Sequence, residues 1–317
     1  MKHFGTFCAV AALIAATGAH AETRVTYKSA KSGSSYYQMG VELAEAMKEA
    51  TGGDISVTLE ESQGSVQNVM EVRARGGDYV FTTPPSLVKA AQGASGPFEG
   101  KGDAKFDEIR TLFPIPSLTM HFVMSGEEPA GEGLAAMDGK TILLGKGSFG
   151  AREGEKYIEM FGMTDKVSIA DAELSNAVAA LKNGQIDGFV TAGSFPAPNV
   201  VEAAASMPVT ILSMTDAEVE QTGSTRTVIP AGTYAGQDSD VVTTSLPVAA
   251  YTTTQMSDDA AYALTKAFWD QKAALADVSP WWTGVTPDLM ETVGAEFHPG
   301  ALRYYDEAGI AVPGATN

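Results

Sequence analysis

The sequence contains a single cysteine, Cys8, and only four histidines among its 317 residues. Cys8, His3 and His20 all lie in the first 21 residues, which leaves His121 and His298 in the rest of the chain. Beyond residue 21 the chain therefore has no disulfide and no thiolate metal site, so its core alone has to stabilise it. Two histidines also cannot form a multi-histidine metal centre within one chain.

Long apolar runs are absent as well, because no stretch reaches the roughly 20 residues that a membrane-spanning helix needs. The apolar run from Phe4 to Ala16 follows the cationic start Met1-Lys2-His3 and precedes Ala19-His20-Ala21, a small-x-small cleavage pattern. This arrangement is typical of a secretory signal peptide. We therefore expect residues 1–21 to be removed and the protein to work in the periplasm.

Basic residues are scarce: 21 lysines and arginines stand against 39 acidic residues, and the formal net charge is −18. A surface of this charge repels nucleic acids and anionic membranes, so neither is expected as a partner. An anionic ligand would need donors placed locally, because the overall field opposes its approach.

Strand and helix patterns alternate along most of the chain, which predicts an α/β architecture with mostly parallel strands. After removal of residues 1–21 the length suggests about two domains. The segment 92–107 is rich in glycine, lysine and acids and is interpreted as a surface loop. Strands are expected at 24–28, 55–59, 79–81, 141–144 and 188–190, and helices at 36–50, 66–73, 151–161, 174–184, from Ser257 through Phe268, and from Pro287.

Three of the expected strand-to-helix turns combine glycine with serine, at residues 33–35, 64–65 and 147–148. Such turns place backbone N–H groups and a hydroxyl at a helix N-terminus, where carboxylates and phosphates bind readily. Any one of them alone is better explained as an ordinary cap, but three together favour a ligand cleft. Arg152 follows the third turn and either clamps a ligand carboxylate or pairs with Glu153 or Glu155.

Enzymatic alternatives find little support in the residues. The motif Gly145-x-Gly147-x-x-Gly150 fits a dinucleotide fingerprint, but an anion-binding or plain tight turn is favoured. No G-x-S-x-G nucleophile motif surrounds Ser148. His121, in an apolar strand, is interpreted as a core histidine and His298, before Pro299, as a capping residue. An exported hydrolase remains the competing class, and we expect no catalysis, no cofactor and no metal.

A set of motifs in a fixed order resembles the TAXI family of solute-binding proteins, which serve TRAP transporters. The resemblance covers nearly the whole chain after residue 21 and rests on the ordered set of motifs: Gly33-x-x-Tyr36-Tyr37-x-x-Gly40, Gly64-Ser65-x-x-Asn68, Asp187-Gly188-Phe189, Gly193-x-x-Pro196, Ile229-Pro230-x-Gly232-Thr233-Tyr234 and His298-Pro299-Gly300-Ala301 with Tyr304-Tyr305-x-Glu307-x-Gly309.

The resemblance implies a type II-like periplasmic-binding-protein fold of two lobes, each a mixed sheet flanked by helices, with the ligand cleft between them. It also implies capture of a small organic anion or amino acid, such as glutamate or another dicarboxylate, and delivery to the membrane subunits of a TRAP transporter. A ligand-sensing subunit would have the same sequence features. We expect a monomer.

The ligand contacts implied by the resemblance are Ser34, Tyr36, Tyr37, Ser65, Asn68, Gly193, Ser194 and Pro196. Two departures touch the expected cleft. The family's Gly-Ser-Gly-Thr turn is replaced here by Ser148-Phe149-Gly150-Ala151, and Thr83 stands where an aspartate often follows the third strand. Thr83, Ser148 and Arg152 complete the expected contacts.

Chain crossings are expected near 113–117 and 225–233. They predict a first lobe of residues 22–115 plus 226–317 and a second lobe of residues 116–225.

Overall fold

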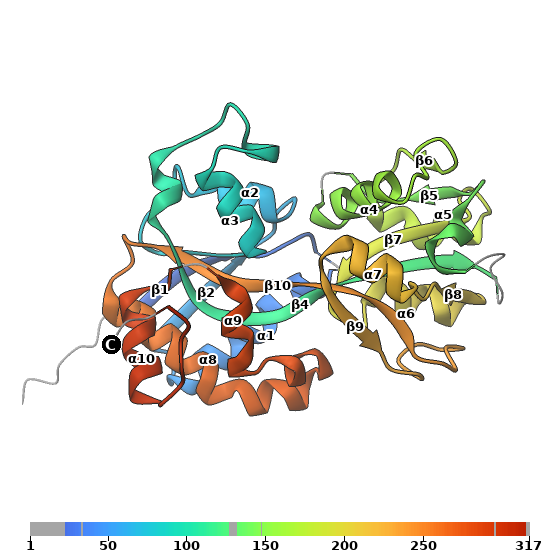
Figure 1. Ribbon diagram of the computed structural model, residues 1–317. Helices are drawn as coiled ribbons and strands as arrows, with labels where there is room; N and C mark the ends of the chain where they lie inside the picture. The colour runs from blue at the N-terminus through green and yellow to red at the C-terminus, as the bar shows by residue number, and fades with distance from the viewer. Residues whose placement is uncertain (1–22, 33, 127–131, 147, 295, 315–317) are drawn as a thin grey trace, which may run out of the picture.

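The computed structural model describes residues 23–32, 34–126, 132–146, 148–294 and 296–314, so the expected signal peptide lies outside the described residues. Figure 1 shows two α/β lobes side by side, joined by two long strands that run through both. One sheet continues through the molecule in the order β2-β1-β3-β10-β4-β7-β5-β6, with β8 beside β4 and β9 beside β10.

Lobe one carries the N-terminal strands, which pair in parallel, β1 lying between β2 and β3. In Figure 1 its helices cover both faces of the sheet, α2 and α3 on one and α1, α8 and α10 on the other. Its elements are β1 (Thr23–Lys28), α1 (Ser35–Ala50), β2 (Ile55–Glu60), α2 (Ser65–Glu71), β3 (Tyr79–Thr83), α3 (Pro85–Gln92), α8 (Asp258–Val278), α9 (Met290–Val293), α10 (Pro299–Glu307) and the 3-10 helices Gly96–Phe98, Ala104–Glu108, η5 (Pro280–Gly284) and Pro287–Leu289.

Lobe two has a mixed sheet, in which β5 pairs in parallel with β6 and β7 while β8 and β9 pair antiparallel with the long strands. Its elements are the 3-10 helix Gly133–Met137, β5 (Thr141–Leu143), α4 (Phe149–Met160), β6 (Ser168–Ala170), the 3-10 helix Leu174–Asn176, α5 (Ala177–Lys182), β7 (Gly188–Gly193), α6 (Pro198–Ser206), β8 (Val209–Ile211), α7 (Asp216–Thr222) and β9 (Thr225–Ile229).

The two long strands, β4 (Ile109–Ser125) and β10 (Val241–Thr253), connect the lobes. They pair with each other antiparallel, and their register shifts between Leu246 and Val248. Pro116 of β4 and Pro247 of β10 lie at this crossing. Proline has no backbone N–H to donate to the neighbouring strand, so β4 and β10 are joined by the fewest hydrogen bonds here.

The segment 113–117, where the first crossing was expected, lies within β4. The segment 225–233, expected to contain the second, instead carries β9, which pairs with residues 241–245 of β10 on the lobe-two side. The strand pairing therefore puts the second passage between lobes near Leu246, about 15 residues later in the chain. Pairing between distant segments is not encoded in local hydrophobic spacing, which explains the displacement.

Mostly parallel strands were expected, but five of the nine strand pairings among the described residues are antiparallel, because β4 and β10 run antiparallel to their neighbours. The expected helix 174–184 is a 3-10 helix followed by the shorter α5. The other expected elements agree closely with the structure, with three further differences. Helix α4 begins at Phe149 rather than at residue 151, because the Ser148 hydroxyl accepts a hydrogen bond from the Ala151 N–H. Helix α8 continues ten residues beyond Phe268. The expected surface loop 92–107 contains two short 3-10 helices, anchored by the buried rings of Phe98 and Phe106.

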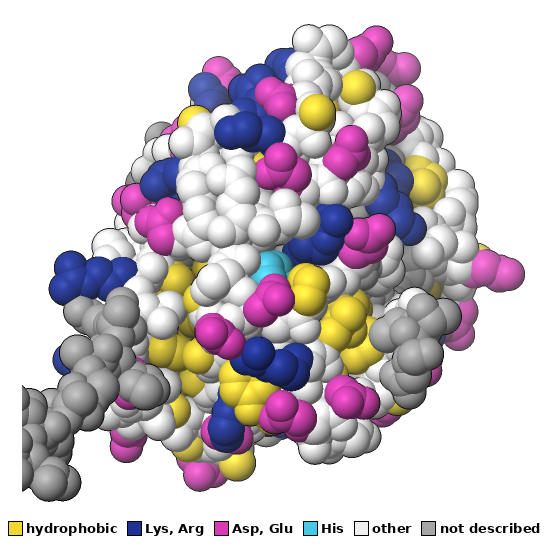
Figure 2. Space-filling view, turned by 90° about the vertical axis from the view of Figure 1, so that its left-hand side faces the viewer, with side chains coloured by type: hydrophobic (Ala, Val, Ile, Leu, Met, Phe, Trp, Pro, Cys, Tyr) yellow, Lys and Arg dark blue, Asp and Glu magenta, His cyan; other side chains and the backbone are white. Residues whose placement is uncertain are grey.

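Acidic and basic side chains are interleaved on the face of the molecule that Figure 2 shows. Figure 2 shows the end of lobe one that faces away from lobe two, where both signs alternate among small apolar areas. Within the described part of the chain, no helix is long and apolar enough to cross a membrane.

Candidate functional site

The N-terminus of α1 points into the space between the lobes (Figure 1). Ser34 caps it: its hydroxyl accepts from the Tyr37 N–H at 3.2 Å and donates to the Lys31 carbonyl at 2.7 Å. No acidic residue lies in the first turn of α1, so the positive end of the helix dipole is not neutralised from within. Gly33, the first glycine of the expected turn, lies outside the described residues.

The N-terminus of α4 approaches the same space from lobe two. Ser148 caps it through the 3.0 Å bond to the Ala151 N–H, and its first turn also lacks an acidic residue. The half-buried Arg152 ends this turn, where burial lowers the pKa of its guanidinium and the carboxylates of Glu155 and Glu153 oppose that change. Gly147 lies outside the described residues.

The two lobes approach each other closely around these helix ends. A Cβ added to Gly64, at the start of α2, would lie 3.9 Å from the Ser148 Cα. A Cβ on Gly193, the last residue of β7, would lie 2.7 Å from the Ser35 Oγ, so a larger residue here would force the Ser35 hydroxyl to move. Across the rim, the Lys31 ammonium contacts the Glu173 carboxylate at 2.5 Å. The serine turns of lobe one and lobe two therefore lie close together where the lobes meet, in a region that we call the cleft.

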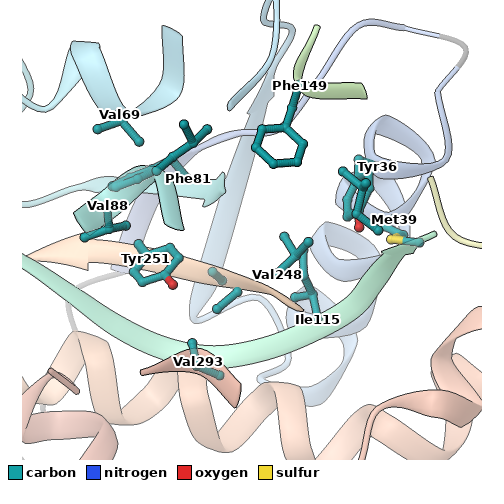
Figure 3. Close-up of a cluster of buried hydrophobic side chains, with 14 of the residues drawn as sticks. Tyr36, Met39, Val69, Phe81, Val88, Ile115, Phe149, Val248, Tyr251 and Val293 are labelled. Carbon is teal, nitrogen blue, oxygen red and sulfur yellow. The ribbon is translucent and has the colours of Figure 1, made fainter. Parts of the chain in front are cut away.

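Phe149, the first residue of α4, fills part of this cleft. Figure 3 shows its ring pointing from α4 toward the crossing strands and lobe one, between Phe81 and Tyr36. The side chain is only 7% exposed and belongs to the same buried cluster as Tyr36, Phe81 and Val248. Sequence reasoning noted Phe149 as a departure from a family motif but did not identify this role, nor the Lys31–Glu173 pair.

Several expected ligand contacts instead have their polar atoms bonded within the protein. The Tyr36 hydroxyl, whose pKa burial raises, donates to the Pro116 carbonyl at 2.9 Å. The Asn68 amide nitrogen donates to the carbonyls of Ser29 and Thr82, at 2.7 and 2.8 Å, and so ties β1 to β3.

The remaining expected contacts are spread over the cleft and its surroundings. Thr83 is fully buried at the end of β3, whereas Tyr37 and Ser65 are partly exposed near the starts of α1 and α2. The Ser194 hydroxyl donates to the Ser117 carbonyl at 2.9 Å. Pro196 lies two residues further along the same turn, beside a different cavity that is described below.

Both histidines outside the first 21 residues are structural. Burial lowers the pKa of His121 to about 4, and its ring lies between the Thr119 carbonyl and the Tyr234 hydroxyl, at 3.0 and 2.8 Å. His298 caps α10 by accepting from the Gly300 N–H at 3.2 Å, and its other ring nitrogen donates to the Met256 carbonyl. The expectations of a core and a capping histidine are confirmed. Among the described residues no cluster of three potential metal ligands is found.

Comparison with known proteins agrees with the two-lobed fold described above. Residues 28–309 match the model of the NMT1-like family. The fold is similar to that of the periplasmic binding protein BugD, with 14% identity over 91% of this chain and 98% of that one and a TM-score of 0.54. It is also similar to a periplasmic sulfonate-binding protein, SsuA of Methylobacillus flagellatus KT, with 13% identity over 94% and 99% of the two chains and a TM-score of 0.52. The two-lobed periplasmic-binding-protein fold expected from the sequence is thereby confirmed.

Proposed function

This chain belongs to the NMT1-like family, and from that premise we propose that it is an extracytoplasmic solute-binding protein for a small organic anion or amino acid. The observation that carries the proposal is the pair of serine-capped helix N-termini, α1 and α4, which face one cleft from opposite lobes without acidic residues in their first turns. Backbone N–H groups at such ends favour a carboxylate.

The charge of the chain sharpens this proposal. With a formal net charge of −18, the surface as a whole repels anions, so local donors have to supply the attraction. The cleft offers the amides of both helix ends, with Arg152 at the end of the first turn of α4, whereas Lys31 is already paired with Glu173. A dicarboxylate or an acidic amino acid would place one carboxylate at each helix end.

The ordered motifs support a finer proposal, that the chain is a TAXI-type subunit acting in the periplasm as a monomer. It would pass its ligand to the membrane subunits of a TRAP transporter. The two proline-bearing crossings, at Pro116 and Pro247, support a hinge about which the lobes close on the ligand. Co-purification of the tagged chain with membrane subunits encoded beside it tests the partnership, and a signalling kinase as the sole partner would contradict it.

A thermal-shift screen of the chain from residue 22 tests the ligand class. Each organic acid is matched with its primary amide, which has similar size but no charge. An acid at 100 times its dissociation constant adds about 2.7 kcal/mol to the free energy of unfolding. We expect stabilisation by one or a few acids and none by their amides; equal stabilisation by the amides would contradict an anion site.

We propose that Arg152 clamps a carboxylate of the ligand, since a guanidinium offers two parallel donors. Arg152→Ala then weakens binding by on the order of 2–4 kcal/mol, or roughly 30- to 1000-fold, and Arg152→Lys recovers only part of it. Lys146→Ala is the matched control, because it removes a cation of the preceding turn that pairs with Asp171. Isothermal titration within threefold of wild type for Arg152→Ala would leave this arginine to its neighbours Glu153 and Glu155.

A further inference from the structure

A second cavity lies between the lobes, on the other side of the crossing strands from Phe149. It has a volume of about 600 Å³ and we call it the rear groove; its walls include Pro116, Phe195, Thr227, Trp281, Gly284 and Leu289. Two of the elements that line it, β9 and the segment that follows α8, lie below β4 and β10 in Figure 1, whereas α2 and α4 face each other above these strands. Both lobes contribute to its walls.

None of the described residues that line the rear groove carries a charge, although charged residues make up 19% of the chain. Five of its hydroxyl groups already make hydrogen bonds within the protein. The Thr227 and Ser245 hydroxyls bond each other at 2.6 Å, that of Ser194 donates to the Ser117 carbonyl, and those of Thr233 and Thr283 donate to the carbonyls of Pro230 and Pro280. What these walls present is therefore mainly methyl groups, proline rings and aromatic faces.

The Trp281 ring, an aromatic part of the wall, is held in place by a hydrogen bond to α1. The Trp281 indole nitrogen donates to the Glu42 carboxylate of α1 at 3.2 Å, and the neighbouring Trp282 donates to the same carboxylate at 2.6 Å. An indole fixed in this way offers a ready surface for stacking, because little side-chain entropy is lost when a ring packs on it.

We propose that the rear groove binds an uncharged aromatic compound, at a site distinct from the anion cleft. Its volume lies within the range of small-molecule sites, which are mostly apolar with a few polar groups. A charged ligand would lose its hydration here without gaining a counter-charge, which makes binding unfavourable. This inference stands on the cavity alone and does not depend on what the cleft binds.

The test uses two dyes with the same ring system. N-phenyl-1-naphthylamine is uncharged, whereas 8-anilino-1-naphthalenesulfonate adds a sulfonate, and both fluoresce more strongly in apolar surroundings. We expect the uncharged dye to saturate at one per chain and to bind at least tenfold more tightly than the sulfonate. Equal or tighter binding of the sulfonate, or no saturation, would overturn the proposal.

Substitutions in the wall locate the binding. A Cβ added to Gly284 meets no atom within 4 Å, so Gly284→Leu is chosen to narrow the groove. It should weaken binding of the uncharged dye at least tenfold, whereas Thr254→Leu, at an exposed position after the far end of β10, should not. Thr283→Trp, at an exposed position on the same wall, is the second blocking variant if Gly284→Leu does not fold. Unchanged binding in a folded blocking variant would refute the assignment.

Discussion

Phe149 is predicted to contribute most to the closed arrangement of the lobes. Its ring is 7% exposed and lies between the lobes (Figure 3), so opening the cleft would return it to water. Burying a phenylalanine side chain is worth about 1.5–3 kcal/mol. The Lys31–Glu173 bridge is 31% and 47% exposed at its two side chains, and such a pair contributes about 0–1 kcal/mol. Burial of the Phe149 ring should therefore stabilise the closed arrangement more than the Lys31–Glu173 bridge does.

Phe149→Ala should shift the equilibrium between closed and open lobes toward open by about 2 kcal/mol, or roughly 30-fold. The absence of cysteine after residue 21 allows the distance to be measured directly, with spin labels on Ser95→Cys in lobe one and Gln185→Cys in lobe two. Double electron–electron resonance should show a longer mean distance between the two spin labels in Phe149→Ala than in wild type. Phe161→Ala, at the far end of α4, is the matched control and should leave the distance unchanged. The same distance in Phe149→Ala and wild type would refute the reasoning.

Three further changes test the same structure. Lys31→Ala should alter the spin-label distance much less than Phe149→Ala does, and a larger opening would contradict the ranking of the two contacts. Glu42→Ala should lower the free energy of unfolding in urea by about 2–4 kcal/mol, because it leaves buried donors of Ser279 and Trp282 without their acceptor; a loss below 0.5 kcal/mol would contradict that role. Burial lowers the pKa of His121 to about 4, below its ordinary 6.5, so its contribution to the free energy of unfolding is present at neutral pH and is lost as the pH falls from about 6.5 to about 4. Between pH 7 and 4.5 the free energy of unfolding of wild type should fall by about 2–3 kcal/mol more than that of His121→Gln. An equal fall in both proteins would contradict a buried neutral His121.

Local patterns were sufficient to predict most elements and the fold class. The alternation of Ile55, Val57 and Leu59 and the serine caps at 34, 148 and 257 depend on neighbouring residues, and all are present in the structure. The sequence analysis expected the second passage between the lobes too early in the chain. The pairing of 225–229 with 241–245 is a tertiary contact that local sequence patterns do not encode.

The candidate site was harder to predict, because most of the motif residues use their polar atoms in hydrogen bonds that stabilise the fold. Tyr36, Asn68 and His298 bond to backbone carbonyls, and the Tyr234 hydroxyl bonds to the His121 ring. The Tyr305 hydroxyl donates to the Leu112 carbonyl at 2.6 Å. Residues that bond within the protein in this way say little about the ligand. Phe149 gave no local signal of its role, because a buried ring between lobes has the same spacing as any first-turn residue of a helix.

The central claim is that a small organic anion binds between the N-termini of α1 and α4, and a crystal structure with the most stabilising acid tests it most directly. The account predicts carboxylate oxygens about 2.7–3.1 Å from first-turn backbone nitrogens of both helices, at residues 35–36 and 149–150. An acid bound elsewhere, or held in the cleft with its carboxylates directed to solvent, would contradict it.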